Sequence, residues 1–179
     1  VLEAEFADVV SSIRPRLKGV ENFICLDDAP SDMVNYEQLI ASYPPDEPAA
    51  YVDEKDIMAL FYTSGTTGRP KGVIRNHRGL LINAENIANI TYKLVPKDIF
   101  LCSAPFSHVG GSMFSLLPVF YMGCTVVILR RFDAAAILES IQKHKVTAIF
   151  LAPTMVGRLI EQPNLHNYDL SSLRLIQYA

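Results

Sequence analysis

The chain has 179 residues, half of them apolar, which is enough for one sizeable core or for one domain and part of another. A composition this apolar excludes an intrinsically disordered chain. The formal net charge of −3 gives no global attraction to nucleic acid or anionic membranes, and Gly, Pro or charged residues interrupt every apolar run before it reaches bilayer-spanning length.

The first 50 residues are predicted to form the end of a preceding α/β subdomain and a connector. Apolar residues recur at helical spacing from Phe6 to Leu17, Gly19 ends this helix, and NFICLDD is a short buried strand. A short helix around residues 36–40 precedes SYPPDEPAAYVDEKD, whose prolines and acidic residues are typical of a solvated connector. We therefore expect residues 1–50 and 51–179 to form separate subdomains.

After the connector, strand and helix patterns alternate along the chain. Strands are predicted at residues 57–62, 73–75, 99–103, 125–129, 147–151 and 173–178, and helices at 76–92, 112–121, 134–143 and 154–161. Asp133 is a natural N-cap for the third of these helices. Strands such as TVVIL and TAIFL are continuously apolar, as in a sheet covered on both faces. The predicted fold class is therefore α/β, with a largely parallel sheet and helices on both faces.

The segment FYTSGTTGRPKGV joins two predicted strands and suits the binding of a polyphosphate. Its glycines allow backbone N–H groups to converge on an anion, its hydroxyl groups add donors, and Lys71 supplies a mobile positive charge. It is not a Walker A loop, because Pro70 precedes the lysine and a strand rather than a helix follows. A plain hydrophilic hairpin is the alternative, but the complete string favours phosphate binding. The other basic residues nearby are Arg69, Arg75, His77 and Arg78.

This string resembles the signature loop of the adenylate-forming superfamily, which includes acyl-CoA synthetases, aryl-CoA ligases, luciferases and peptide-synthetase adenylation domains. The segment APFSHVGG resembles a second motif of that family, with His108 where the family often has a histidine or an aromatic residue. His77 resembles the histidine that follows the second strand, in a structural role. The resemblance covers essentially the whole chain.

The resemblance implies a two-step reaction, in which a carboxylate attacks the α-phosphorus of ATP and the thiol of coenzyme A then takes the acyl group. It implies that Lys71 steadies the departing pyrophosphate and that Thr66 and Thr67 lie near Mg²⁺ bound with ATP. His108 would lie beside the acid, with Val109 and Gly110 along the substrate pocket. The implied phosphate-binding residues are Thr63, Ser64, Gly65, Thr66, Thr67, Gly68 and Lys71.

Some of these residues have a purely structural alternative. His108 could cap a helix or lie in the core, although the glycines after Val109 favour close approach to a ligand. Met113 and Phe114 could border the acyl pocket, but a Met–aromatic pair on a helix is more often part of the core.

The family's later motifs are not found in these 179 residues: a Tyr-Gly-x-Thr-Glu segment for magnesium, a ribose-binding aspartate and a C-terminal catalytic lysine. We therefore expect an internal fragment of an acid–thiol ligase that synthesises no acyl-CoA by itself. A peptide-synthetase adenylation domain is one alternative, although APFSHVGGSMF offers no aspartate for an amino group. A non-catalytic nucleotide-binding module is another. Fatty, aromatic and short acids all remain open as substrates.

The three cysteines and the N-terminal segment bear on the compartment. Cys25, Cys102 and Cys124 lie far apart in apolar runs, with no C-x-x-C pair and no histidine at metal-ligand spacing, which argues against zinc. The first ten residues, VLEAEFADVV, lack the basic region and the long apolar stretch of a signal peptide. These features predict reduced, buried thiols in a cytoplasmic protein.

Overall fold

The computed structural model describes residues 1–63 and 68–178 and divides into two compact units, Val1–Tyr51 and Val52–Ala179. In the first unit a small core of Ala7, Phe23, Cys25 and Met33 joins the helices to a two-stranded parallel sheet. Its elements are η1 (Ala4–Phe6), α1 (Ala7–Ile13), η2 (Arg14–Arg16), β1 (Ile24–Cys25), β2 (Val34–Asn35) and α2 (Tyr36–Ala41). Residues 43–51, in the predicted connector, are exposed and without regular structure.

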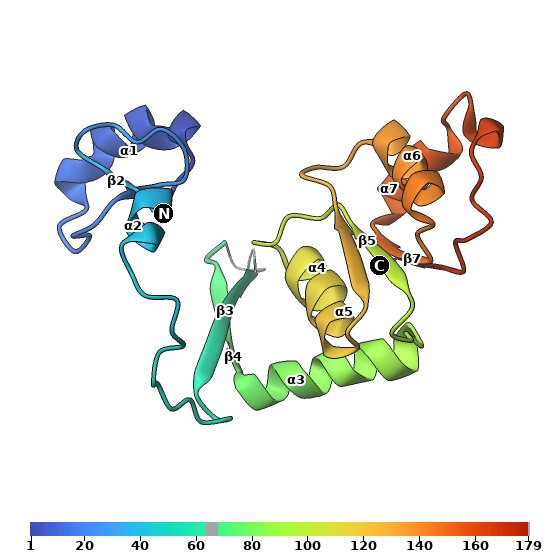
Figure 1. Cartoon of the computed structure of the whole chain (residues 1–179), viewed down its shortest axis with the longest axis horizontal. Helices are drawn as coiled ribbons and strands as arrows, with labels where there is room; N and C mark the ends of the chain where they lie inside the picture. The colour runs from blue at the N-terminus through green and yellow to red at the C-terminus, as the bar shows by residue number, and fades with distance from the viewer. Residues whose placement is uncertain (64–67, 179) are drawn as a thin grey trace. The chain divides into compact units, whose positions relative to one another are not determined.

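The second unit begins with an antiparallel hairpin and continues into an α/β sandwich (Figure 1). The hairpin strands are β3 (Ile57–Thr63) and β4 (Lys71–Asn76), as predicted. The elements that follow are α3 (His77–Asn86), η3 (Ile87–Thr91), β5 (Ile99–Cys102), α4 (Val109–Gly111), η4 (Ser112–Leu116), α5 (Leu117–Tyr121), β6 (Thr125–Ile128), α6 (Ala134–His144), β7 (Ala148–Leu151), α7 (Pro153–Ile160), η5 (Leu165–Asn167) and β8 (Leu175–Tyr178).

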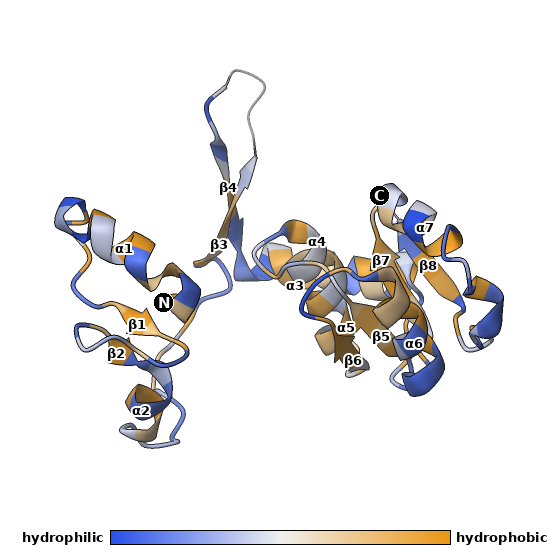
Figure 2. Ribbon diagram, turned by 90° about the horizontal axis from the view of Figure 1, so that it is seen from above, coloured by the Kyte–Doolittle hydropathy of each residue, from blue (hydrophilic) through white to orange (hydrophobic). Residues whose placement is uncertain are grey.

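The strands β6, β5, β7 and β8 form one sheet in that order, and every pair is parallel. Alternate strand residues serve two cores, as the period of a strand requires. Leu101 and Ile149 pack with α6 and α7 on one face, whereas Phe100 and Ala148 pack with η3 and α5 on the other. Figure 2 shows that the sheet strands are largely apolar. The α/β fold with helices on both faces is therefore confirmed.

Two of the predicted helices are interrupted by π-helical segments, η3 and η4. In the second case the cause is Pro118, which lacks the N–H that would bond to the carbonyl oxygen of Phe114. That oxygen accepts a hydrogen bond from the hydroxyl of Tyr92 instead, at 2.8 Å. The predicted cap at Asp133 is confirmed, because its carboxylate accepts from the N–H of Ala136 at 2.8 Å.

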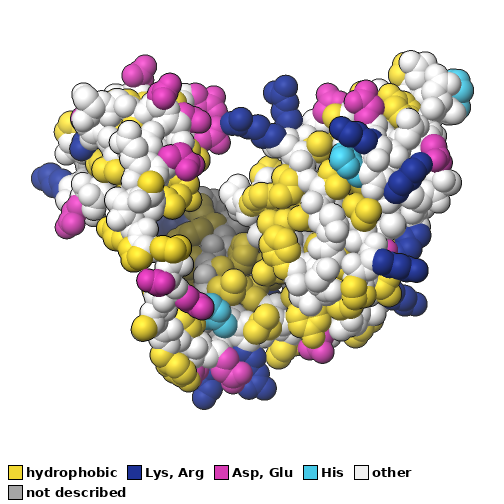
Figure 3. Space-filling view, in the orientation of Figure 1, with side chains coloured by type: hydrophobic (Ala, Val, Ile, Leu, Met, Phe, Trp, Pro, Cys, Tyr) yellow, Lys and Arg dark blue, Asp and Glu magenta, His cyan; other side chains and the backbone are white. Residues whose placement is uncertain are grey.

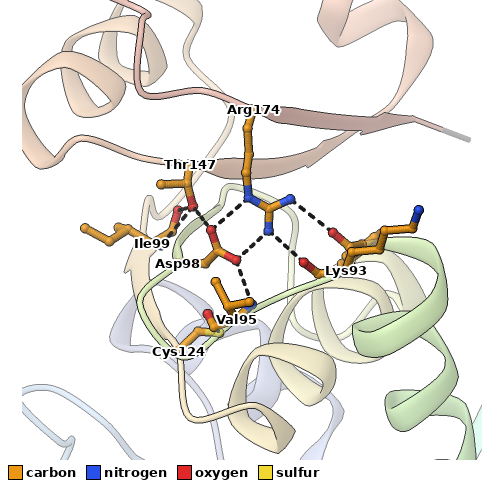
Figure 4. Close-up of polar contacts among 8 residues, drawn as sticks. Lys93, Val95, Asp98, Ile99, Cys124, Thr147 and Arg174 are labelled. Atoms are coloured by element: carbon orange, nitrogen blue, oxygen red, sulfur yellow. Dashed lines mark hydrogen bonds and ion pairs between the residues drawn. The ribbon is translucent and has the colours of Figure 1, made fainter.

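A buried carboxylate, Asp98, holds together the amino ends of the central strands (Figure 4). Its side chain is only 3% exposed and forms an ion pair with Arg174. It also accepts hydrogen bonds from the N–H of Val95 at 2.8 Å and from the hydroxyl of Thr147 at 2.7 Å. Burial alone raises the pKa of Asp98, but the hydrogen bonds from these three partners outweigh it and lower the pKa to about 2.

Arg174 extends this network to the end of the helical segment η3. Its guanidinium donates to Asp98 through two nitrogens and also to the carbonyl oxygens of Tyr92 at 3.3 Å and Lys93 at 3.1 Å. Such a fork of donors suits the planar geometry of arginine. The network therefore fastens β8 to the turn between η3 and β5.

No helix among the described residues is long and apolar enough to cross a membrane.

Candidate active site

A cavity of about 530 Å³ lies beside the β3–β4 hairpin, within the second unit. It is lined by residues of both hairpin strands, of α3, of the turn before α4 and of η4, so segments far apart in the sequence meet there. Most of its lining is apolar, with a few polar side chains, as is usual for small-molecule sites. The lining residues are Leu60, Phe61, Tyr62, Thr63, Val73, Arg75, Asn83, Ser107, His108, Val109, Met113 and Phe114.

A second cavity, of about 270 Å³, shares His108, Val109 and Phe114 with the first. It reaches the carboxyl end of β7, where the ring of Phe150 stacks on Phe114 with centroids 5.5 Å apart. In an α/β sheet the carboxyl ends of the strands are the usual place for ligands. Apolar side chains gather on the surface around α4 and α5 (Figure 3), and Phe120 of α5 is 60% exposed.

His108 stands between the two cavities and also caps α4. Its Nδ1 accepts a hydrogen bond from the N–H of Gly110 at 3.0 Å. A neutral imidazole whose Nδ1 accepts carries its proton on Nε2. The capping role that was the structural alternative is therefore present, and it leaves the Nε2–H as the donor that a ligand in either cavity could use.

The glycines after Val109 are required by packing. A Cβ on Gly111 would lie 2.3 Å from the carbonyl oxygen of Pro105, and a Cβ on Gly110 would lie 3.2 Å from the ring of Phe150. Both glycines are buried. Other groups do approach the backbone of these glycines closely, as expected, but the groups described there belong to the protein itself. The glycines thus hold His108 and the turn before it in place.

Replacing Gly111 by alanine is expected to lower the free energy of unfolding by about 1–3 kcal/mol, because the new Cβ would overlap the backbone at Pro105. Gly157→Ala in α7 is the matched control: nothing lies within 4 Å of its Cβ, and it should gain about 0.5–1 kcal/mol from helix propensity. Urea-induced unfolding measures both. Equal stabilities for the two variants would show that the turn at Pro105 yields without cost.

The structure places the ends of the predicted phosphate loop directly opposite each other. Thr63 ends β3, Lys71 begins β4, and the two are partners in the hairpin register. Gly68 has a φ of 83°, which favours glycine. Thr63 lines the larger cavity, whereas Gly68 and Lys71 do not. Four of the predicted loop residues lie outside the described part of the chain: Ser64, Gly65, Thr66 and Thr67.

Two of the basic residues near the loop in sequence, Arg75 and Arg78, have different contacts in the structure. Arg78 pairs with Glu54 at 2.9 Å, and Arg75 faces the larger cavity. These two residues therefore have different surroundings.

No group of three or more His, Cys, Asp or Glu side chains that could hold a metal occurs among residues 1–63 and 68–178. The two residues predicted to lie near Mg²⁺, Thr66 and Thr67, are outside these ranges. Magnesium is commonly held by one or two carboxylates and the phosphates of the substrate.

The sequence did not identify Asn83 and Phe150 as cavity residues, and it indicated Arg75 only as a basic residue near the phosphate loop. Asn83 lies three residues after the buried Leu80, on the inner side of α3, and a polar residue there was a readable signal. Phe150 belongs to a continuously apolar strand, which gives no indication of which face borders a cavity.

Three comparisons bear on this site. A family model described as "AMP-binding enzyme" matches residues 2–179. The 4-coumarate–CoA ligase 2 of Solanum tuberosum is 37% identical over 156 residues, and the 4-coumarate–CoA ligase CCL1 of Humulus lupulus is 33% identical over 178. The matches cover 86% and 97% of this chain but only 29% and 32% of those two proteins.

Solved structures of similar enzymes superpose on nearly the whole of this chain. The anthranilate–CoA ligase AuaEII in complex with anthranoyl-AMP superposes with a TM-score of 0.88 at 27% identity, over 98% of this chain and 35% of that one. The amide bond synthetase McbA from Marinactinospora thermotolerans superposes with a TM-score of 0.78 at 30% identity, over 98% and 34%.

Proposed function

The chain belongs to the AMP-binding enzyme family, and from this premise we propose that the full-length protein is an ATP-dependent acid–thiol ligase. It would activate a carboxylic acid as an acyl-adenylate, release pyrophosphate, and transfer the acyl group to coenzyme A. The similar ligases span about three times the length of this chain, so the proposal concerns the whole protein. We also propose that it acts in the cytoplasm, in keeping with its three free cysteines.

One observation carries the proposal: Thr63, where the phosphate-binding string begins, lines the same cavity as His108. A nucleotide held by the loop and an acid held beside His108 would therefore meet at one end of this cavity. Adenylation needs that proximity above all, because positioning and charge stabilisation supply most of its acceleration.

In this proposal, separate groups of residues bind the nucleotide and the acid. The loop from Thr63 to Gly68 would bind the β- and γ-phosphates, and Lys71, which begins β4, would stabilise the charge on the departing pyrophosphate. The Nε2–H of His108 would donate to a carboxylate oxygen of the acid, while Val109 and Phe114 exclude water from it. Mg²⁺ bound to the phosphates would neutralise part of their charge, with Thr66 and Thr67 nearest to it.

The proposal is tested by measuring two activities of the full-length protein over a panel of fatty, aromatic and short acids. Acid-dependent exchange of labelled pyrophosphate into ATP reports adenylation, and release of AMP that requires coenzyme A reports thiolation. Both should appear with the same acid. Exchange with amino acids alone would indicate a peptide-synthetase adenylation domain, and the absence of exchange with every acid would indicate a non-catalytic module.

Replacing His108 by alanine is expected to raise the KM for the acid about 10- to 100-fold, the effect of losing one hydrogen bond to a charged group, with a much smaller change for ATP. His108→Asn is the control, because asparagine also caps helices and so keeps the bond to Gly110. The kinetics are measured by pyrophosphate exchange. Wild-type kinetics in His108→Asn would reduce His108 to its capping role.

A further inference from the structure

The polar side chains of the larger cavity that the proposed chemistry does not use include Arg75 and Asn83. Both are half-buried. Neither side chain has a hydrogen bond or an ion pair with any residue in the ranges 1–63 and 68–178, whereas Arg78, three residues after Arg75, is paired with Glu54. A half-buried arginine with no partner among the described residues needs its hydrogen-bond acceptors from water or from a ligand.

The register of the hairpin sets Arg75 far from the phosphate loop. Lys71 lies opposite Thr63 at the loop end, and Arg75 lies opposite Ala59, four residues further along β4. At about 3.3 Å per residue this is roughly 13 Å along the strand. The cavity therefore has a reacting end at Thr63 and a remote end at Arg75, with Val73 between them on the same side of β4.

Arg75 and Asn83 together supply the cavity mainly with hydrogen-bond donors. A guanidinium offers five N–H donors and no acceptor, and the amide of Asn83 offers donors and one acceptor. Their complement is an oxygen that accepts, and a charged oxygen would be bound more strongly than a neutral one. An alkyl chain would leave both groups unsatisfied, which is the basis on which buried polar groups reject an apolar analogue.

We propose that Arg75 and Asn83 select an acid that carries a second oxygen function, a hydroxyl or a carboxylate, at the end remote from the reacting carboxylate. This inference rests on the proposed function, because it assumes that the acid occupies the larger cavity. It narrows the substrate class to acids that are polar at both ends and apolar between, and it makes plain fatty acids poor substrates.

The test uses matched acids and the full-length protein. Pyrophosphate exchange is measured with 3-phenylpropenoic acid and its 4-hydroxy and 4-carboxy derivatives, and with octanoic and octanedioic acids. In the wild type, the oxygenated member of each active series is expected to have a kcat/KM about 10-fold or more above that of the plain member. In Arg75→Met this preference should fall to near unity, chiefly through a higher KM for the oxygenated acid.

Two further variants sharpen the result. Asn83→Leu should reduce the same preference less, since it removes no charge, and Arg78→Met, whose side chain pairs with Glu54 on the surface, should leave it unchanged. The KM for ATP should be the same in Arg75→Met as in the wild type, and exchange with plain acids should not fall, because the arginine that disfavours them is gone.

The inference is overturned if the wild type prefers the plain acids, or if Arg75→Met weakens all acids equally or raises the KM for ATP. A higher KM for ATP in Arg75→Met would place Arg75 at the nucleotide. Failure of the proposed function is a separate result, because it appears as a wild type that exchanges pyrophosphate with no acid at all.

Discussion

Lys71→Met in the full-length protein is expected to slow acid-dependent exchange of pyrophosphate into ATP about 30- to 1,000-fold. The ammonium group would make charge-assisted hydrogen bonds that matter most as pyrophosphate departs, and losing one preorganised donor costs about 2–4 kcal/mol of transition-state stabilisation. Each ~1.4 kcal/mol is a factor of ten in rate. Methionine keeps the bulk of the side chain without its charge.

The two half-reactions separate this role from a general loss of structure. Thiolation of presynthesised acyl-adenylate involves no pyrophosphate, so it should be affected much less. Lys143→Met, at an exposed position in the last turn of α6, is the matched control and should leave both half-reactions unchanged. Wild-type exchange in Lys71→Met, or an equal fall of both half-reactions with ATP binding intact, would contradict the assignment.

Arg174→Met is expected to lower the free energy of unfolding by about 3–5 kcal/mol, since it leaves the buried carboxylate of Asp98 without its counter-charge. Asp98→Asn should cost less, because an amide oxygen can still accept from Val95 and the guanidinium, which is 39% exposed, can reach water. Urea-induced unfolding gives the energies, and hydrogen exchange of the β5 and β8 amides restricts the readout to the second unit.

An exposed ion pair provides the control for this prediction. Lys145 and Asp169 are joined at 2.7 Å, but both side chains are largely exposed. Exposed pairs contribute little to stability, so Lys145→Met should leave the urea midpoint nearly unchanged. A loss in Arg174→Met no larger than in Lys145→Met would show that the buried network adds nothing to the fold.

The same network predicts how stability depends on acid. Because the folded-state pKa of Asp98 is lowered to about 2, its contribution is complete above the unfolded pKa near 3.9 and is lost as the pH falls through the folded value. A difference of this size is worth about 2.5 kcal/mol. The contribution should therefore disappear between about pH 4 and pH 2 in the wild type. Stability curves that are parallel for wild type and Arg174→Met over this interval would contradict it.

Local patterns in the sequence were sufficient for most of the fold. Apolar periodicity, turn residues and the cap at Asp133 predicted the helices and the parallel strands, because each depends on residues close together in the chain. The interruption at η4 was harder to foresee, since it needs Tyr92 to reach the carbonyl oxygen that Pro118 leaves free. That contact joins residues 22 positions apart.

The candidate site was predictable only in part, because only some of its residues belong to a local sequence motif. The loop string and His108 each carry a local motif, so both could be named in advance. The position of Arg75 depends on the register of two strands. Phe150 and His108 border the same smaller cavity only when β7 is paired in the sheet. Contacts of this kind have no signature in a single sequence, because the residues that make them come from separate elements.

The separation of Asp98 and Arg174 in the sequence has a consequence for the order in which this unit folds. The two residues are 76 positions apart, so during synthesis the carboxylate emerges long before the guanidinium that neutralises it. Until then Asp98 lacks its counter-charge, and burying a carboxylate without one is costly, so we expect Asp98 to stay hydrated. The arrival of Arg174 supplies the missing charge and donates to the carbonyl oxygens of Tyr92 and Lys93. We therefore expect docking of β8 and burial of Asp98 to be coupled, late in the folding of this unit.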